Sequence, residues 1–212
     1  MRQTLRPALA SLLLLTLVTG VAYPLLVSGL SMLLFPRLAG GSMLVVDGRE
    51  VGSELIGQPF DDPNYFWSRP SVTLPVPYNA AASGGSNLAP GNAQLLDAIS
   101  RRVRALRAAD PENLAPVPVD LVTASGSGLD PQISVAAAKY QVGRVAHARN
   151  QDPKTIAELI DQHTERAAFG MIGEARINVL ELNLALDGKS IRSPAKSSAA
   201  PGAGSRWPMS TQ

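Results

Sequence analysis

The fold is decided by residues 7–36, whose sequence is PALASLLLLTLVTGVAYPLLVSGLSMLLFP. This stretch contains no charged residue and is bounded by Arg6 and Arg37. A helix of this length, at ~1.5 Å per residue, is ~45 Å long and exceeds the ~30 Å hydrocarbon core of a bilayer. No charged residue interrupts it to form a solvent-facing side, which argues against a core helix. The sequence therefore predicts a transmembrane helix, loosened or kinked at Pro24.

A cleaved secretory signal is the main alternative for this stretch. Arg2 and Arg6 provide a basic start, and Gly20 and Ala22 fit the small residues of a cleavage site. The apolar run continues well past that site, as far as Leu34. Cleavage would leave this surface exposed to water, so we expect the helix to be retained.

The basic residues at the two ends of the span predict its orientation. Arg2 and Arg6 precede it with no acidic residue among them, whereas residues 37–50 contain both signs of charge. The positive-inside rule then places the N-terminus in the cytoplasm and the following domain outside.

The rest of the chain predicts one domain of the mixed α+β class and a tail. Residues 1–36 are a cytoplasmic stub and the transmembrane helix, residues 37–187 form the extracytoplasmic domain, and residues 188–212 form a tail. The tail is rich in Ser, Pro, Ala and Gly, so it buries too little surface to fold and we expect disorder. The expected elements are a hairpin over 43–56 turning at Asp47-Gly48, helices over 92–109, 130–149 and 153–164, and strands over 119–124 and 176–186. The N-caps expected for the three helices are Asn92, Asp130 and Asp152, the last two followed by proline.

Catalytic and metal-binding patterns are scarce. The chain has no cysteine, which excludes disulfides and thiol catalysis. Its histidines, His147 and His163, lack the H-E-x-x-H spacing of a metal site, and no Gly-x-Ser-x-Gly elbow is present. The net charge of +2 is too small to point to nucleic acid. We therefore expect no catalytic residue, no metal and no nucleic-acid partner.

Residues 125–131, SGSGLDP, are expected to join a strand to a helix, as phosphate-cradling turns do. The Walker pattern requires Gly-Lys-Ser/Thr, whereas Gly128 is followed by Leu129 and Asp130. An acidic side chain at the start of a helix also competes with an anion for the same amides. The turn is thus either an anion site or a tight connection, and we favour the connection.

A long uncharged loop runs from Tyr78 to Asn92. Long loops of this kind in compact domains are often functional. We interpret it either as packed on the domain or as contacting a partner. The candidate contact residues are Tyr78, Asn79, Ser83, Gly84, Gly85, Ser86 and Asn87.

Several blocks of the sequence together resemble a known family. They are YPLL at 23–26, GSELIGQ at 52–58, YFWSRPS at 65–71, PYN at 77–79, ASGGSNL at 82–88, LVTASGSGLD at 121–130, QVGRVAHARN at 141–150 and VLELNLALD at 179–187. In this order, over about residues 4–187, they are similar to the C subunit of the bacterial Kdp potassium-transporting ATPase.

The resemblance implies a non-catalytic accessory subunit in the bacterial inner membrane. Its implied partners are a potassium-channel-like subunit, a P-type ATPase subunit and a small single-span subunit, together with membrane lipid. The Asp-Lys-Thr-Gly phosphorylation motif and a Thr-Val-Gly-Tyr-Gly-like filter are absent from this sequence, so the chain cannot pump alone.

Two roles follow from the resemblance. One is a catalytic chaperone that raises the affinity of the ATPase subunit for ATP, which would implicate Ser125, Gly126, Ser127, Gly128 and Gln141. The chain would then have no cofactor of its own and would meet ATP through its partner. The other is an extracytoplasmic cap that stabilises the assembly, which agrees with the predicted orientation because a domain outside the membrane meets no ATP. An alternative outside the family is a membrane-anchored periplasmic solute-binding or sensor domain, with Tyr65, Trp67 and the loop 78–92 as its pocket.

Overall fold

The computed structural model describes residues 2–166 and 173–189. Its elements are α1 (Arg2–Leu17), the π-helix η1 (Val18–Ala22), α2 (Tyr23–Leu34), α3 (Pro36–Ala39), β1 (Met43–Val46), β2 (Arg49–Ser53), the 3-10 helix η2 (Ala80–Ala82), α4 (Ala93–Ala109), the 3-10 helix η3 (Val119–Leu121), β3 (Gln132–Ser134), α5 (Val135–Tyr140), α6 (Val142–Arg149), α7 (Pro153–Gln162), β4 (Arg176–Asn178) and α8 (Val179–Leu186). The described residues have the mixed architecture that the sequence predicts. The predicted tail lies outside the described residues from 190 onward.

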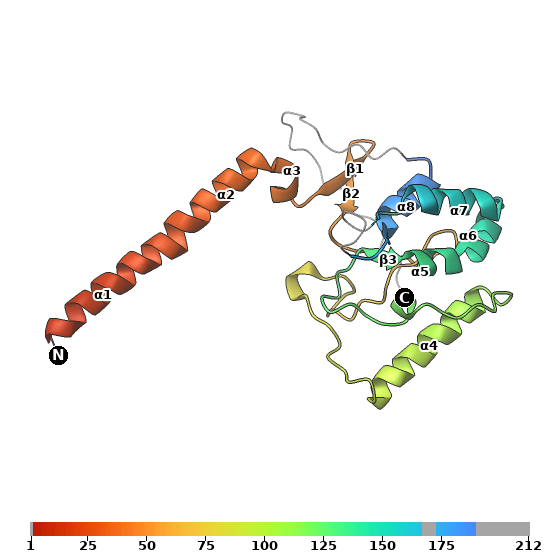
Figure 1. Ribbon diagram of the computed structural model, residues 1–212, viewed down its shortest axis with the longest axis horizontal. Helices are drawn as coiled ribbons and strands as arrows, with labels where there is room; N and C mark the ends of the chain where they lie inside the picture. The colour runs from red at the N-terminus through yellow and green to blue at the C-terminus, as the bar shows by residue number, and fades with distance from the viewer. Residues whose placement is uncertain (1, 167–172, 190–212) are drawn as a thin grey trace.

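A long apolar helix projects from the body of the protein (Figure 1). Its run from Thr4 to Leu34 contains an 18-residue window with a mean hydropathy of 2.1, and none of that window is buried against the rest of the chain. It is long and apolar enough to cross a membrane. The helix widens just before Pro24, where the N–H of Tyr23 donates to the carbonyl of Val18, five residues earlier. The predicted loosening at the proline is confirmed, and it takes the form of a π-turn.

The apolar helix is joined to the domain by a hydrogen-bonded corner. The N–H of Ser42 donates to the carbonyl of Arg37 at 2.9 Å, and the N–H of Glu54 donates to the carbonyl of Ser42 at 3.1 Å. The guanidinium of Arg37 pairs with the carboxylate of Glu54. Helix α3 is thereby fixed to the end of β2.

The hairpin formed by β1 and β2 confirms the turn predicted at Asp47-Gly48. Both residues have positive φ, 51° and 77°, as a tight two-residue hairpin turn requires. Leu44 and Val46 point from β1 onto α8, where they form a small core with Leu180 and Leu184. The hairpin thus connects the membrane-side corner to the C-terminal helix.

The main core lies among the helices α5–α8, which are grouped together in Figure 1, and the two-stranded sheet of β3 and β4. Ile133 and Ile177 face each other across that antiparallel sheet and are both buried. Helix α4 extends away from this group, and Leu106 is its one fully buried residue. The N-caps predicted for α4 and α7 are confirmed, because Asn92 accepts from Gln94 N and Asp152 accepts from Lys154 N, both at 2.8 Å.

The helix predicted over 130–149 is wrong at its start. Asp130 accepts from the N–H of Gln132 at 3.0 Å in a local turn, and residues 132–134 form β3. The helix begins only after Ser134, whose hydroxyl accepts from Ala137 N at 3.0 Å. The Asp-Pro pair resembles a helix start, but the sheet with β4 takes up the next residues.

Two predicted strands are also corrected. The segment 119–124 contains the 3-10 turn η3, closed by bonds from the N–H groups of Val122 and Thr123 to the carbonyl of Val119. The pattern over 176–186 gives only the short strand β4, after which Asn178 caps α8. Helix α8 is buried on nearly all sides, so its apolar residues carry no helical periodicity. Gly188, assigned to the tail, has φ 64° and closes the end of α8.

No strand among the described residues pairs with the segment through Phe66 and Trp67, and two buried side-chain amides take that place. Asn183 accepts from Phe66 N at 2.8 Å and donates to Phe66 O at 3.0 Å. Gln141 accepts from Trp67 N at 2.8 Å and donates to Trp67 O at 3.2 Å. Each carboxamide thus satisfies one peptide group on both sides, as a paired strand would.

The Gln141 clamp gives a test of this arrangement. Gln141→Leu keeps a similar volume but leaves the peptide of Trp67 and the guanidinium of Arg144 without their partner. Since unpaired buried polar groups cost ~1–3 kcal/mol each, we expect the free energy of unfolding to fall by about 2–5 kcal/mol. The measurement is chemical unfolding of the purified full chain. Gln162→Leu, at an exposed position on α7, is the matched control and should change it by less than about 0.5 kcal/mol. Equal stability of the two variants would contradict the clamp.

Candidate functional site

The structure brings together the two glycine-rich segments that the sequence singled out. The N–H of Gly84 donates to the carbonyl of Ser127 at 2.9 Å, and the hydroxyl of Ser83 reaches the same carbonyl at 3.1 Å. A Cβ on Gly85 would lie 3.0 Å from the carbonyl oxygen of Gly126. The candidate partner-contact loop therefore packs directly on the candidate nucleotide-binding turn. Glycine is needed because backbone lies against backbone.

The turn at 125–128 is held by its own hydroxyl groups. Ser125 Oγ accepts from Gly128 N at 2.9 Å, and Ser127 Oγ accepts from Leu129 N at 3.1 Å. Ser71 Oγ donates to the carbonyl of Gly128 at 2.7 Å. Both serine side chains of the turn are thus engaged in shaping it.

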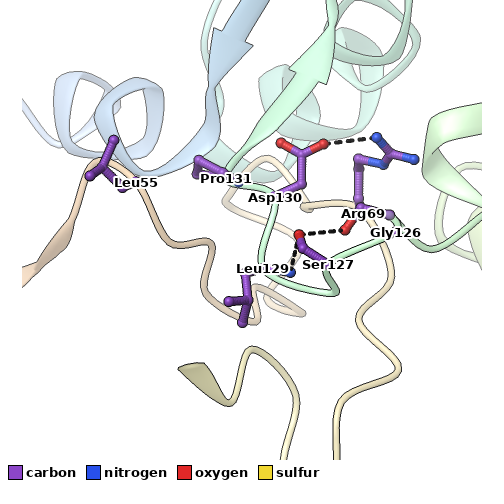
Figure 2. Close-up of a pocket in the computed structure, with 8 residues that line it drawn as sticks. Leu55, Arg69, Gly126, Ser127, Leu129, Asp130 and Pro131 are labelled. Atoms are coloured by element: carbon purple, nitrogen blue, oxygen red, sulfur yellow. Dashed lines mark hydrogen bonds and ion pairs between the residues drawn. The ribbon is translucent and has the colours of Figure 1, made fainter. Parts of the chain in front are cut away.

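A shallow, open hollow of about 550 Å³ lies beside this turn. It is lined by Leu55, Arg69, Ser125, Gly126, Ser127, Leu129, Asp130 and Pro131. Figure 2 shows Arg69 and Asp130 pointing toward each other at its edge, and their ion pair measures 2.8 Å. The two opposite charges compensate each other, so the hollow presents backbone and hydroxyl groups rather than a net charge. Such a surface can accept a neutral polar group or a peptide.

Tyr78 and Asn79 support the loop from inside. The phenol of Tyr78 donates to the carbonyl of Arg69, and burial raises the pKa of that phenol. Its ring lies so close to Gly57 that a side chain there would collide with it. The side chain of Asn79 accepts from Ala81 N at 3.1 Å and donates to Leu74 O at 2.7 Å. Ser86 and Asn87 are exposed.

The remaining residue implicated in nucleotide contact, Gln141, lies elsewhere. Its side chain is buried, holds the peptide of Trp67 and accepts from Arg144 Nη2 at 2.7 Å. It does not line the hollow beside the turn. The helix expected directly after the turn is replaced by β3, so the turn does not lead into a helix N-terminus. Direct nucleotide contact at these residues stays a prediction of the resemblance.

Two arginines, Arg144 and Arg149, hold the aromatic segment, and no sequence motif had indicated this role. The guanidinium of Arg144 stacks 4.2 Å from the ring centroid of Trp67 and donates to Pro63 O at 2.6 Å. Burial lowers its pKa to about 10, so it remains protonated at neutral pH. The signal available was the pair of basic residues in QVGRVAHAR and the aromatic run YFW, which together suggest cation–π contacts.

Arg149 performs the same task for Tyr65. Its guanidinium lies 4.9 Å from that ring, donates to Asn64 O at 2.6 Å and pairs with Asp187 at 2.7 Å. Burial alone would raise the pKa of Asp187, but hydrogen bonds from Arg149 and Tyr65 lower it below its ordinary value. Both aromatic rings named for a solute pocket are therefore covered by guanidinium groups.

The two histidines do not meet. His147 is exposed beside a second hollow of about 610 Å³, between the end of α4 and α6, whereas His163 is turned to the carbonyl of Leu159 at 3.0 Å. Among residues 2–166 and 173–189, no three His, Asp or Glu side chains come together as a metal site would require.

Fold and site together define a class: a small mixed α and β domain carried on one helix long enough to span a membrane. The family model described as KdpC, K+-transporting ATPase, c chain, matches residues 5–188, and the chain belongs to this family. A relative from Polaromonas naphthalenivorans is 59% identical over 195 residues, which cover 92% of this chain and all of that protein. One from Methylococcus capsulatus is 62% identical over 182 residues, 86% of this chain and 96% of the relative. Both carry the name potassium-transporting ATPase KdpC subunit. The predicted family is confirmed.

Two glycines of the turn provide a matched pair for testing its geometry. Gly128 has φ 68°, and a Cβ there would lie 2.6 Å from Thr73 Cγ2 and 2.8 Å from Gly84 O. We expect Gly128→Ala to lower the free energy of unfolding by about 2–4 kcal/mol, from backbone strain and displacement of the loop.

The control is Gly126→Ala, because a Cβ at Gly126 meets nothing within 4 Å. We expect it to change stability by less than about 0.5 kcal/mol. Thermal unfolding of the full chain measures both variants. A Gly126 variant as unstable as the Gly128 variant would show that the two loops do not pack as described.

Proposed function

We propose that this chain is a non-catalytic accessory subunit of an ATP-driven potassium uptake complex. Its apolar helix anchors it in the membrane and its domain lies on the extracytoplasmic side, where it contacts and stabilises the transporting subunits. The proposed partners are a potassium-channel-like subunit, a P-type ATPase subunit and a small single-span subunit. Membership of a family named for a potassium-transporting ATPase, over residues 5–188, is the observation that carries this proposal.

The rigid corner between helix and domain supports a positioning role. The bonds among Arg37, Ser42 and Glu54 fix the direction in which the domain leaves the end of the helix. A domain that only needed tethering could use a flexible linker instead. A fixed corner suits a subunit that must present one face of its domain to neighbours in the same membrane.

The orientation of the domain decides between the two roles that the family suggests. An extracytoplasmic domain has no access to cellular ATP, so it would act by contact with its partners. A cytoplasmic domain could instead take part in nucleotide binding at Ser125–Gly128. The basic residues before the span, Arg2 and Arg6, favour the extracytoplasmic arrangement.

Cysteine labelling tests this orientation, because the chain has no cysteine of its own. Ser83 is exposed, and we expect Ser83→Cys in the assembled complex to react with a membrane-impermeant maleimide on cells whose outer membrane has been permeabilised. Gln3→Cys, before the span, is the control and should react only after lysis. Protection of Ser83→Cys until lysis would reverse the orientation and favour the nucleotide-linked role.

Removing the apolar helix tests the anchoring. We expect deletion of residues 1–36 to abolish co-purification of the other subunits, because losing a membrane tether lowers the effective concentration by ~10²–10⁴. Circular dichroism and thermal unfolding report whether the domain itself stays folded. A second variant carries an unrelated apolar span in place of residues 7–34 and separates tethering from specific helix contacts. Full assembly with the deleted chain would contradict the proposal.

A further inference from the structure

The domain carries a long stretch without charge. Charged residues make up 17% of the chain, yet none occurs between Arg69 and Asp97. Much of this stretch is at the surface: residues 74–77 are exposed, and Gly84 and Gly85 are partly exposed. Solvated loops of a soluble surface ordinarily contain charged side chains, so this composition points to a surface that a partner covers.

The most exposed part of this stretch is Leu74-Pro75-Val76-Pro77, which we name the apolar tip. Leu74 is 76% exposed and Val76 is 56% exposed. Both are large aliphatic side chains exposed to water, and neither belongs to a hydrophobic cluster formed by the described residues.

The apolar tip is held rigidly from behind. Thr73 Oγ1 donates to the carbonyl of Val76 at 2.8 Å and accepts from Asn79 N at 3.0 Å. Asn79 Nδ2 donates to the carbonyl of Leu74 at 2.7 Å, and Ser71 Oγ accepts from Tyr78 N at 2.9 Å. A loop ordered in advance loses little conformational entropy on binding, so it suits a docking element better than a flexible loop would.

The chemistry of the stretch favours a protein partner over lipid. Segments that settle into the membrane interface use Trp, Tyr, Lys and Arg as anchors. Between Arg69 and Asp97 there is no Trp, Lys or Arg, and the one Tyr, Tyr78, turns its phenol inward to Arg69 O. An uncharged tip of aliphatic side chains and prolines instead matches an uncharged, apolar protein surface. Contact between two such surfaces buries no charged group, so it carries no cost of desolvating a charge.

The position of the stretch suggests where this partner lies. Helix η2, which follows the apolar tip, lies on the side of the domain that faces the long apolar helix (Figure 1). A protein that contacts this side of the domain is one embedded in the membrane next to the apolar helix. We propose that the apolar tip docks on an uncharged, apolar surface of a membrane-embedded subunit of the same complex. This inference rests on the proposed function and adds to it the point of contact.

Photo-crosslinking in the complete complex tests the docking. A benzophenone-bearing residue replaces Leu74 in the full chain, in native membranes containing all subunits. We expect ultraviolet light to join it to a membrane subunit, identified by mass spectrometry, with a yield at least about fivefold above that from the same residue at position 114. Leu114 is 92% exposed and lies outside the uncharged stretch, so it is the matched control. Equal yields, products with lipid only, or no product would overturn the proposal.

Charge insertion gives an independent measurement. Leu74→Asp places an unpaired carboxylate where the partner would cover it, so we expect the yield of purified complex to fall about tenfold, whereas Leu114→Asp leaves it unchanged. Unfolding of each free variant shows that the domain itself is intact, since both positions are exposed. A normal yield with Leu74→Asp would overturn the docking.

If the unaltered chain fails to co-purify with the subunits, the proposed function itself fails; if it co-purifies but position 74 behaves like position 114, only the docking inference fails.

Discussion

The structure depends on satisfying the peptide groups of a segment that pairs with no strand among the described residues. Phe66 is fully buried and Trp67 is partly buried against the core, and the side-chain amides of Asn183 and Gln141 bind their peptide groups on both sides. An unpaired buried peptide group costs as much as a lost hydrogen bond, so this segment could not lie here without those two side chains. The clamps bring α8 and the α5–α6 junction together around one strand-like segment.

This arrangement also links the domain to the long apolar helix. The corner at Ser42 joins that helix to the hairpin, and Leu44 on the hairpin packs against Leu180 of α8. Helix α8 in turn supplies Asn183 to the clamp on Phe66. Each contact in the series is a hydrogen bond or a buried apolar contact between ordered elements. The position of the domain relative to the apolar helix is therefore set by the same residues that hold its core.

Local signals predicted the parts of the fold that depend on local chemistry. The uncharged run, the Asp47-Gly48 turn and the caps at Asn92 and Asp152 each specify a backbone conformation within a few residues, and the structure contains all of them. Helix α8 and strand β3 could not be predicted in this way. Their conformations are set by burial against distant segments, which removes the amphipathic period that a sequence pattern relies on.

In the candidate site, too, local sequence signals predicted some features, whereas contacts between distant segments set the others. The two glycine-rich loops were both recognised in the sequence as candidate contact segments. Their packing on each other was not predicted, because that contact joins residues more than forty positions apart. Gln141, predicted as a possible nucleotide contact, is buried and supports the core by donating to Trp67 O, a role that the sequence did not indicate.

The domain uses charged and uncharged side chains for different purposes on the two sides of Arg69. Arg69 pairs with Asp130, Arg149 with Asp187, and Arg144 is stacked on Trp67, so these charges hold backbone segments in place. The loops beyond Arg69 are supported by hydroxyl and amide side chains, which need no compensating charge when a partner covers them. A surface built this way can be buried with little desolvation cost, since neutral groups already bonded within the loop lose few bonds to water. Residues 70–96 thus form a charge-free part of the domain, whereas the neighbouring charges of Arg69, Arg144 and Arg149 are used to hold its backbone segments together.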